Sequence, residues 1–121
     1  LSFNICYNSG ERVMGLVQSG AARSHLLARP ELLWPVPPHW SLQDAATVPL
    51  AYCLAYYCLI GTLRSDMYPG MRVLIHGGAG ALGQALISIA LAHRCEVFTT
   101  VSDVRKKQFL LQLFPKLKGI V

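Results

Sequence analysis

Strand-like and helix-like patterns of apolar residues alternate through the second half of the chain. A short apolar strand over 72–76 follows the turn signal Pro69-Gly70, and a helical pattern runs from about Ala81 to Ala92. A second strand covers 95–101. A helix over about 103–113 follows it, with Ser102 as the N-cap, and a further strand begins at 120. This order predicts an α/β fold, the first half of a Rossmann-type parallel sheet with right-handed crossovers.

The first half of the chain is less regular. The run 12–17 is typical of a strand, and 22–28 is compatible with a second one. Three prolines within 35–38 exclude a regular helix or a central strand, so we expect a connector there and a domain boundary near it. Ser41 and Asp44 have the form of a capping box, which predicts a short helix to about Val48.

An uncharged apolar stretch covers 45–63. Pro49 suits the first turn of a helix from Leu50 to about Leu63. The stretch is long enough to be a membrane span, but Tyr52, Tyr56 and Tyr57 lie in its middle, where tyrosine is unusual in a span. We therefore expect a helix buried between protein layers, and no membrane association.

The composition favours a folded segment of a longer protein. The chain is 53% hydrophobic and 14% charged, which excludes a disordered segment because enough apolar surface can be buried to offset the entropy of ordering. It begins without a methionine and ends on an apolar run that resembles the start of a strand. We read it as a fragment.

Most of the net charge of +5 lies near the end of the chain. The segment 102–121 has one acid, Asp103, and a charge of +4, and its five cations are Arg105, Lys106, Lys107, Lys116 and Lys118. No extended basic stripe with interleaved aromatic residues accompanies them, so we expect no nucleic-acid partner. The four cysteines form no CxxC pair, and no histidine has acid or cysteine partners at metal-ligand spacing. A reducing, cytoplasmic compartment and no metal are the simpler interpretation.

The turn between the first strand and the first helix of this unit has the chemistry of a phosphate cradle. Its sequence is Gly78-Ala79-Gly80-Ala81-Leu82-Gly83, a GxGxxG motif in the strand–turn–helix context that dinucleotide sites require. We assign the tight turn to Gly78, close approach of the backbone to a pyrophosphate to Gly80, and close helix–sheet packing to Gly83. The free amides at the helix start favour an anion. The alternative is a glycine-rich turn that binds nothing.

The end of the second strand bears on which dinucleotide is bound. An NAD site usually has an acid here for the ribose 2′-hydroxyl, but this strand ends in hydroxyl residues, and cations follow shortly after. Thr100, Ser102 and Lys106 suit the 2′-phosphate of NADPH, since charge-assisted hydrogen bonds to phosphate are strong. Arg105 and Lys107 fit a solvated helix face equally well. Asp103 is the counter-evidence, because NAD would compete if this carboxylate reached the ribose.

With these residues in hand, the chain resembles the enoyl reductase domain of animal-type fatty acid synthase, a zinc-free member of the medium-chain dehydrogenase/reductase superfamily. The resemblance covers nearly the whole chain from Arg12 onward. The matching stretches are Arg12-Val-Met-Gly-Leu-Val17, Leu33-Trp34-x-Val36-Pro37, Trp40-Ser41-Leu42, Ala45-Ala46-Thr47-Val48-Pro49, Ala55-Tyr56-Tyr57, Val73-Leu-Ile-His-Gly77 and Cys95-x-Val97-Phe98-Thr99-Thr100-Val101.

The resemblance implies hydride transfer from NADPH to the double bond of an enoyl chain carried on acyl carrier protein, within a cytosolic, dimeric megasynthase. Residues 1–40 would then end a GroES-like substrate domain, 41–64 would be connecting buried helices, and 65–121 would be the first half of the dinucleotide-binding domain. The proton donor is expected beyond Val121, so the catalytic residue is unknown and the fragment alone would not be active.

Two alternatives remain. One is a stand-alone quinone oxidoreductase, which the Phe-Thr-Thr and Ala-Tyr-Tyr runs disfavour. The other is a catalytically silent nucleotide-binding or scaffold module. The family that the chain resembles usually has a threonine near the nicotinamide where this chain has Leu54, and leucine cannot donate a hydroxyl hydrogen bond.

Overall fold

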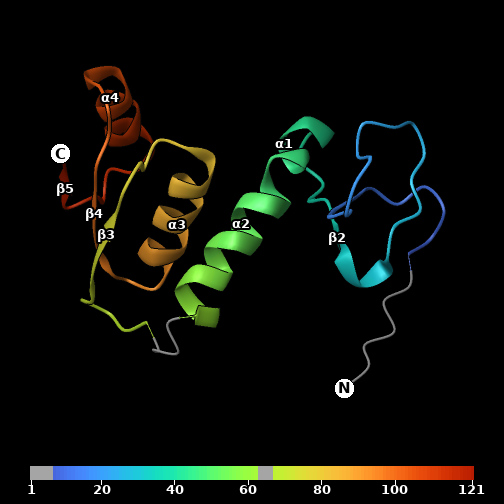
Figure 1. The fold of residues 1–121 in the computed structure, drawn as a ribbon, viewed down its shortest axis with the longest axis horizontal. Coiled ribbons are helices and arrows are strands. Elements are labelled where there is room, and N and C mark those ends of the chain that lie inside the picture. Colours follow the sequence, from blue (N-terminus) through green and yellow to red (C-terminus); the bar gives the residue numbers. More distant parts are fainter. Residues whose placement is uncertain (1–6, 63–66) are drawn as a thin grey trace. The chain divides into compact units, whose positions relative to one another are not determined.

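The computed structural model describes residues 7–62 and 67–121, and the chain divides into two compact units, Leu1–Leu50 and Ala51–Val121 (Figure 1). The organisation that we expected from the resemblance stays a prediction: residues 1–40 as the end of a GroES-like domain, 41–64 as connecting buried helices and 65–121 as the first half of a dinucleotide-binding domain.

A two-stranded antiparallel ribbon forms the first unit together with short helical segments. Strand β1 (Val13–Gly15) pairs with β2 (Leu33–Pro35), which the 3₁₀ turn η1 (Pro30–Leu32) precedes. Helix α1 (Leu42–Ala46) begins at the predicted capping box. Ser41 Oγ accepts the Asp44 N–H at 3.0 Å, and Asp44 Oδ2 accepts the Ser41 N–H at 3.2 Å.

Two predictions for this unit are wrong. The described residues 22–28 contain no strand, and the proline-rich run opens with strand β2 instead of a connector. Pro35 is tolerated because it lies opposite Val13, while the Val36 N–H donates to Arg12 O at 2.9 Å in the neighbouring pair. The ladder therefore requires no N–H from Pro35, as is usual for proline in an edge strand.

A parallel three-stranded sheet is the centre of the second unit. Its strands β3 (Arg72–Ile75), β4 (Glu96–Thr99) and β5 (Gly119–Ile120) lie side by side in chain order. Helices α3 (Ala81–Ala92) and α4 (Val104–Leu113) make the two crossovers, and α3 lies against β3 and β4 (Figure 1). The predicted α/β fold with a parallel sheet is confirmed.

One face of this sheet carries the core. The buried cluster joins strand residues with apolar residues of both helices, namely Ile75, Val97, Ile120, Ile87, Ala90 and Leu110. Side chains of a strand alternate between its two faces, so the intervening positions point the other way. There Leu74 is 58% exposed, and Arg72 Nε lies 3.3 Å from Glu96 Oε2 on the neighbouring strand. This second face has no comparable cover among the described residues.

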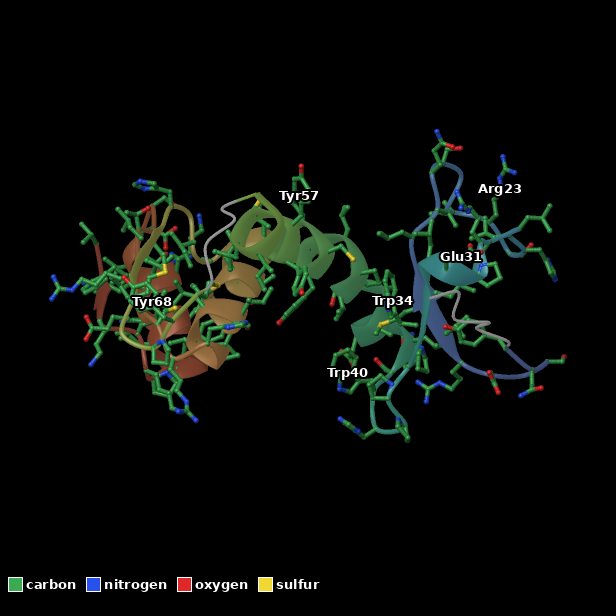
Figure 2. All side chains as sticks on the ribbon, turned by 90° about the horizontal axis from the view of Figure 1, so that it is seen from below. Arg23, Glu31, Trp34, Trp40, Tyr57 and Tyr68 are labelled. Atoms are coloured by element: carbon green, nitrogen blue, oxygen red, sulfur yellow. The ribbon has the colours of Figure 1, made fainter. Side chains whose placement is uncertain are left out.

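The apolar helix is less buried than we expected. Helix α2 (Val48–Tyr56) continues into a π-helical segment, η2 (Tyr57–Thr62). Ala55 and Leu59 are buried, but Leu50 is 71% exposed and Leu54 44%, and Figure 2 shows Tyr57 projecting outward from the helix. The expectation of a helix buried between layers stays a prediction, because the described residues cover only part of the circumference of α2.

By length and composition alone, the stretch Leu42–Gly61 passes the test for a membrane-crossing helix, with 22% of its most apolar window buried. A core helix of a soluble protein passes the same test. The expectation of no membrane association therefore stays a prediction.

Candidate dinucleotide site

The glycine turn lies at the carboxyl ends of β3 and β4. The register places Ile75, the last residue of β3, opposite Thr99, the last residue of β4. Beyond them the Thr100 N–H donates to Ile75 O at 3.1 Å, and the Gly78 N–H donates to Thr100 O at 3.1 Å. The turn is therefore tied to the end of the second strand, at the edge of a parallel sheet where α/β proteins bind their ligands.

Gly77, which we did not single out from the sequence, makes the tight turn. Its φ is +72°, a conformation that residues with a side chain rarely adopt, whereas Gly78 has no positive φ. The assignment of the tight turn to Gly78 is therefore wrong. The doublet Gly77-Gly78 was the available signal, because a strand that turns sharply before a GxGxxG motif needs a glycine before the motif begins.

Gly78 and Gly83 are required by packing. A Cβ on Gly78 would overlap the Thr99 hydroxyl and lie 3.0 Å from Ile87 Cδ1, and a Cβ on Gly83 would lie 2.7 Å from Gly78 Cα. Gly83 thus lets α3 pack closely against the glycine turn, whereas we predicted close packing against the sheet. A Cβ on Gly80 would instead meet only Gly77 O, at an ordinary 3.5 Å. The space beside Gly80 is open, which fits a backbone position that a ligand approaches.

The amides of the turn fall into two groups. The Gly78 and Gly80 N–H groups donate within the protein, to Thr100 O and Gly77 O. Those of Ala79, Ala81 and Leu82 make no hydrogen bond with any other residue in the described part of the chain. Gly80 is the N-cap of α3, so Ala81 and Leu82 lie in its first turn, at the positive end of the helix dipole. This arrangement can receive an anion.

A pocket of about 320 Å³ opens beside the turn. It brings together five residues predicted for the site, Ala79, Gly80, Thr100, Ser102 and Lys106, with Gly77 and Val101, which we did not predict. Gly78, Ala81, Leu82 and Gly83 belong to the turn and the helix start but do not line this pocket. Of the three consecutive cations after the second strand, Lys106 alone lines it. Arg105 and Lys107 are exposed on α4.

The rim of the pocket is built around Asp103. Its Oδ1 accepts the Lys106 N–H at 2.9 Å, which makes Asp103 the N-cap of α4. The Lys106 Nζ donates to Ser102 Oγ at 2.7 Å and lies 3.5 Å from Asp103 Oδ2. The backbone N–H of Lys106 holds the pKa of Asp103 below its ordinary value, and the Lys106 charge acts in the same direction. The prediction of Ser102 as the N-cap is wrong, because the Asp103 carboxylate makes that bond and leaves the Ser102 hydroxyl to the ammonium group.

Metal-binding side chains do not converge in the described residues, where no group of three or more His, Cys, Asp or Glu could hold a metal ion. The site therefore rests on backbone amides, two hydroxyl residues and one lysine.

A glycine turn that joins a parallel strand to a helix, with free amides and a cationic rim, defines a Rossmann-type nucleotide-binding unit. No family model matches the chain. It is 39% identical over 109 residues to the partially reducing polyketide synthase tpeA of Talaromyces stipitatus, a match that covers 88% of this chain and 4% of tpeA.

Solved structures agree with this class. The quinone oxidoreductase of Thermus thermophilus, whose structures include a complex with NADPH, aligns with a TM-score of 0.81 at 29% identity over 93% of this chain and 36% of that one. The CurK enoyl reductase aligns with a TM-score of 0.66 at 38% identity over 74% of this chain and 26% of that one. These neighbours are enoyl reductases and quinone oxidoreductases of the medium-chain dehydrogenase/reductase superfamily, and a segment of such a domain fits this chain.

The expectation of a fatty acid synthase is wrong in detail, because the sequence relatives are polyketide synthases. The runs behind that expectation lie in β1, β2 and α1 of the first unit, in α2, and in β3, the glycine turn and β4 of the second, and these are elements that build the fold. Such positions carry no information about the acyl chain that a megasynthase builds.

Proposed function

We propose that this chain is the nucleotide-binding segment of an NADPH-dependent enoyl reductase, which reduces the double bond of an enoyl thioester on acyl carrier protein within a cytosolic, dimeric megasynthase of the polyketide type. The relatives and the fold support this proposal. The chain spans about 4% of the length of the first polyketide synthase that it matches, so activity, substrate and partners of the whole protein are part of the proposal.

The observation that carries the proposal is the pairing of Lys106 with Ser102 on the rim of the pocket. NADPH differs from NADH by a phosphate on the adenosine ribose, and a lysine held beside a hydroxyl supplies a charge-assisted partner for it. Asp103 is the acid that would favour NAD. Its carboxylate is engaged with the Lys106 backbone and lies within 3.5 Å of both the Ser102 hydroxyl and the Lys106 ammonium. Because the Asp103 carboxylate is engaged in this way, it supports the choice of NADPH over NADH as the cofactor.

The remaining residues would hold the cofactor by its diphosphate. The free amides of Ala79, Ala81 and Leu82 would receive it, and the absence of a Cβ on Gly80 would let it approach. Bound NADPH would supply the hydride. The described residues would bind and orient the cofactor, and the proton donor is expected beyond Val121.

Binding of the intact protein to NADPH and NADH tests the cofactor. We expect Lys106→Ala to raise the Kd for NADPH about tenfold, the scale of one hydrogen bond to a charged group, and to leave the Kd for NADH unchanged. Lys107→Ala is the matched control, because Lys107 is exposed and lies outside the pocket lining. Wild-type preference for NADH would overturn the choice of cofactor.

The alternative of a catalytically silent module rests on Leu54. The family that the sequence resembles usually has a threonine at this position. In the structure Leu54 lies on α2 with 44% of its surface exposed. Crotonyl-thioester-dependent NADPH oxidation by the intact protein separates the readings, with Leu54→Thr measured alongside and a simple quinone as the alternative acceptor. Turnover of the thioester by the wild type supports the enoyl reductase. Turnover by Leu54→Thr alone supports the silent module, and turnover of the quinone alone supports the stand-alone oxidoreductase.

A further inference from the structure

No role in the site has been given to His76 so far, yet its ring is hydrogen-bonded to Thr100, a residue that lines the pocket. It follows β3 directly and is exposed. Its Nδ1 lies 3.3 Å from Oγ1 of Thr100, which follows β4. The same Oγ1 accepts the backbone N–H of Gly77 at 3.2 Å. The Thr100 hydroxyl therefore lies within hydrogen-bond distance of two groups, the Gly77 N–H and the His76 ring, on the glycine-turn side of the pocket.

The backbone of Thr100 is held by hydrogen bonds on both sides. Its N–H donates to Ile75 O and its carbonyl accepts the Gly78 N–H, each at 3.1 Å. A threonine hydroxyl has one proton and two lone pairs, and the Gly77 N–H already uses one lone pair. The direction of the hydroxyl proton then depends on His76. If Nδ1 accepts, the proton points to the ring. If Nδ1–H donates, both lone pairs are used and the proton turns away from the ring.

We propose that His76 is a positioning residue for the dinucleotide, whose Nδ1–H donates to Thr100 Oγ1 and turns the hydroxyl proton of Thr100 toward the diphosphate. This inference rests on the proposed function, since it concerns the same pocket. Thr100 lines that pocket together with Gly77 and Gly80. An anion in the pocket attracts the hydroxyl proton and so favours the histidine tautomer that donates from Nδ1.

The inference separates two ends of the cofactor. Lys106 and Ser102 lie at the rim, where the phosphate that distinguishes NADPH from NADH is expected. From the sequence we grouped Thr100 with Ser102 and Lys106 for the 2′-phosphate. In the structure the Thr100 hydroxyl lies beside the Gly77 N–H and His76. His76 and Thr100 are therefore assigned to the diphosphate, which the two cofactors share. Loss of His76 should therefore weaken both cofactors equally, whereas loss of Lys106 should weaken NADPH selectively. A residue that only stabilised the fold would also weaken both cofactors, so the double variant, the conservative variants and the melting temperatures are needed to exclude that role.

The experiment is a titration of the intact protein with NADPH and with NADH, using His76→Leu, Thr100→Val and the double variant. We expect each single variant to raise both Kd values by the same factor, about threefold to tenfold, the scale of one hydrogen bond. The double variant should be no weaker than Thr100→Val, because the two side chains act through one bond. His76→Asn, which keeps a donor near the position of Nδ1, should restore most of the affinity, and so should Thr100→Ser.

Three results would overturn the inference. They are unchanged affinities in His76→Leu, a double variant whose loss is the product of the two single losses, and a loss confined to NADPH. In each of these cases the proposed function survives, because wild-type binding is intact. A wild type that binds neither cofactor overturns the proposed function and this inference together. Melting temperatures of all variants identify any loss that comes from unfolding.

Discussion

At the scale of the residue, Gly77 and the three glycines of the GxGxxG motif are needed for different physical reasons. Gly77 is needed for its positive φ, and Gly78 and Gly83 for the space that a Cβ would take from Thr99 and from the turn itself. Gly80 has open space beside it. The motif alone does not make this distinction, because it records only where side chains are missing.

This difference predicts that one alanine substitution lowers stability and that another weakens NADPH binding. Gly83→Ala should lower the free energy of unfolding by about 1–3 kcal/mol, the usual cost of overpacking, since the backbone of Gly78 lies 2.7 Å from the new Cβ. Gly80→Ala should change stability by less than about 1 kcal/mol and yet weaken NADPH binding, because its Cβ fills the space meant for the diphosphate. Thermal unfolding and NADPH titration of the intact variants measure both effects. Unchanged NADPH binding in Gly80→Ala would contradict the proposed approach of the cofactor.

At the scale of the element, helix α4 shows how one side chain serves both the helix and the site. Asp103 begins the helix through Lys106 N, and the same turn places Lys106 Nζ beside Ser102. Had Ser102 been the cap, its hydroxyl would have been used by a backbone amide. Because Asp103 and not Ser102 is the cap, the Ser102 hydroxyl can pair with Lys106 at the pocket.

We expect the start of α4 to be acid-sensitive. The pKa of Asp103 is lowered in the folded protein by the Lys106 N–H, so folding favours the carboxylate. Its stabilising effect is complete above the unfolded pKa of about 3.9 and is lost as the pH falls through the lower folded value. Hydrogen exchange of the α4 amides should therefore be faster in Asp103→Ala than in wild type at about pH 6, with the difference shrinking at an acid pH below the unfolded value.

Ser102→Ala is the control for this measurement, because it leaves the cap in place and should preserve the protection of α4 at both pH values. The same protection in Asp103→Ala and in wild type at neutral pH would show that the cap does not hold the start of the helix.

At the scale of the whole molecule, apolar surface is left uncovered. Leu74 is 58% exposed on the face of the sheet opposite α3, and α2 exposes Leu50 and Leu54. Exposed apolar patches of this kind mark surfaces that bind another part of a protein or cause aggregation. The outer edges of β3 and β5 are also unpaired within the described residues.

We therefore expect Leu74→Glu to have opposite effects in two settings. In the excised segment 1–121 it should reduce binding of a hydrophobic dye and reduce aggregation, because it replaces exposed apolar surface. In the intact protein it should lower stability by about 1–3 kcal/mol, if the rest of the chain covers this face, since a charge would then be buried. Dye fluorescence and thermal unfolding of both forms give the comparison. An intact protein unaffected by the substitution would show that the face stays open.

The strong local patterns were predicted correctly from the sequence. The apolar runs around the glycine turn define β3, α3 and β4, and the Ser41–Asp44 capping box forms as expected. Weaker local signals failed where pairing decided the outcome. The prolines excluded a central strand and suggested a connector, but pairing with Val13–Gly15 makes Leu33–Pro35 an edge strand.

What the sequence by itself determined is the order of strands and helices, the glycine turn and the resemblance to a superfamily, because periodicity, glycine spacing and capping depend on neighbours along the chain. Tertiary structure decided which residues share the pocket and which groups are already bonded. It brought His76 to Thr100, and it engaged Asp103 with Lys106 and Ser102. The physical reason is that the register of parallel strands and the first turn of a helix set these distances, and neither is written in the spacing of any motif.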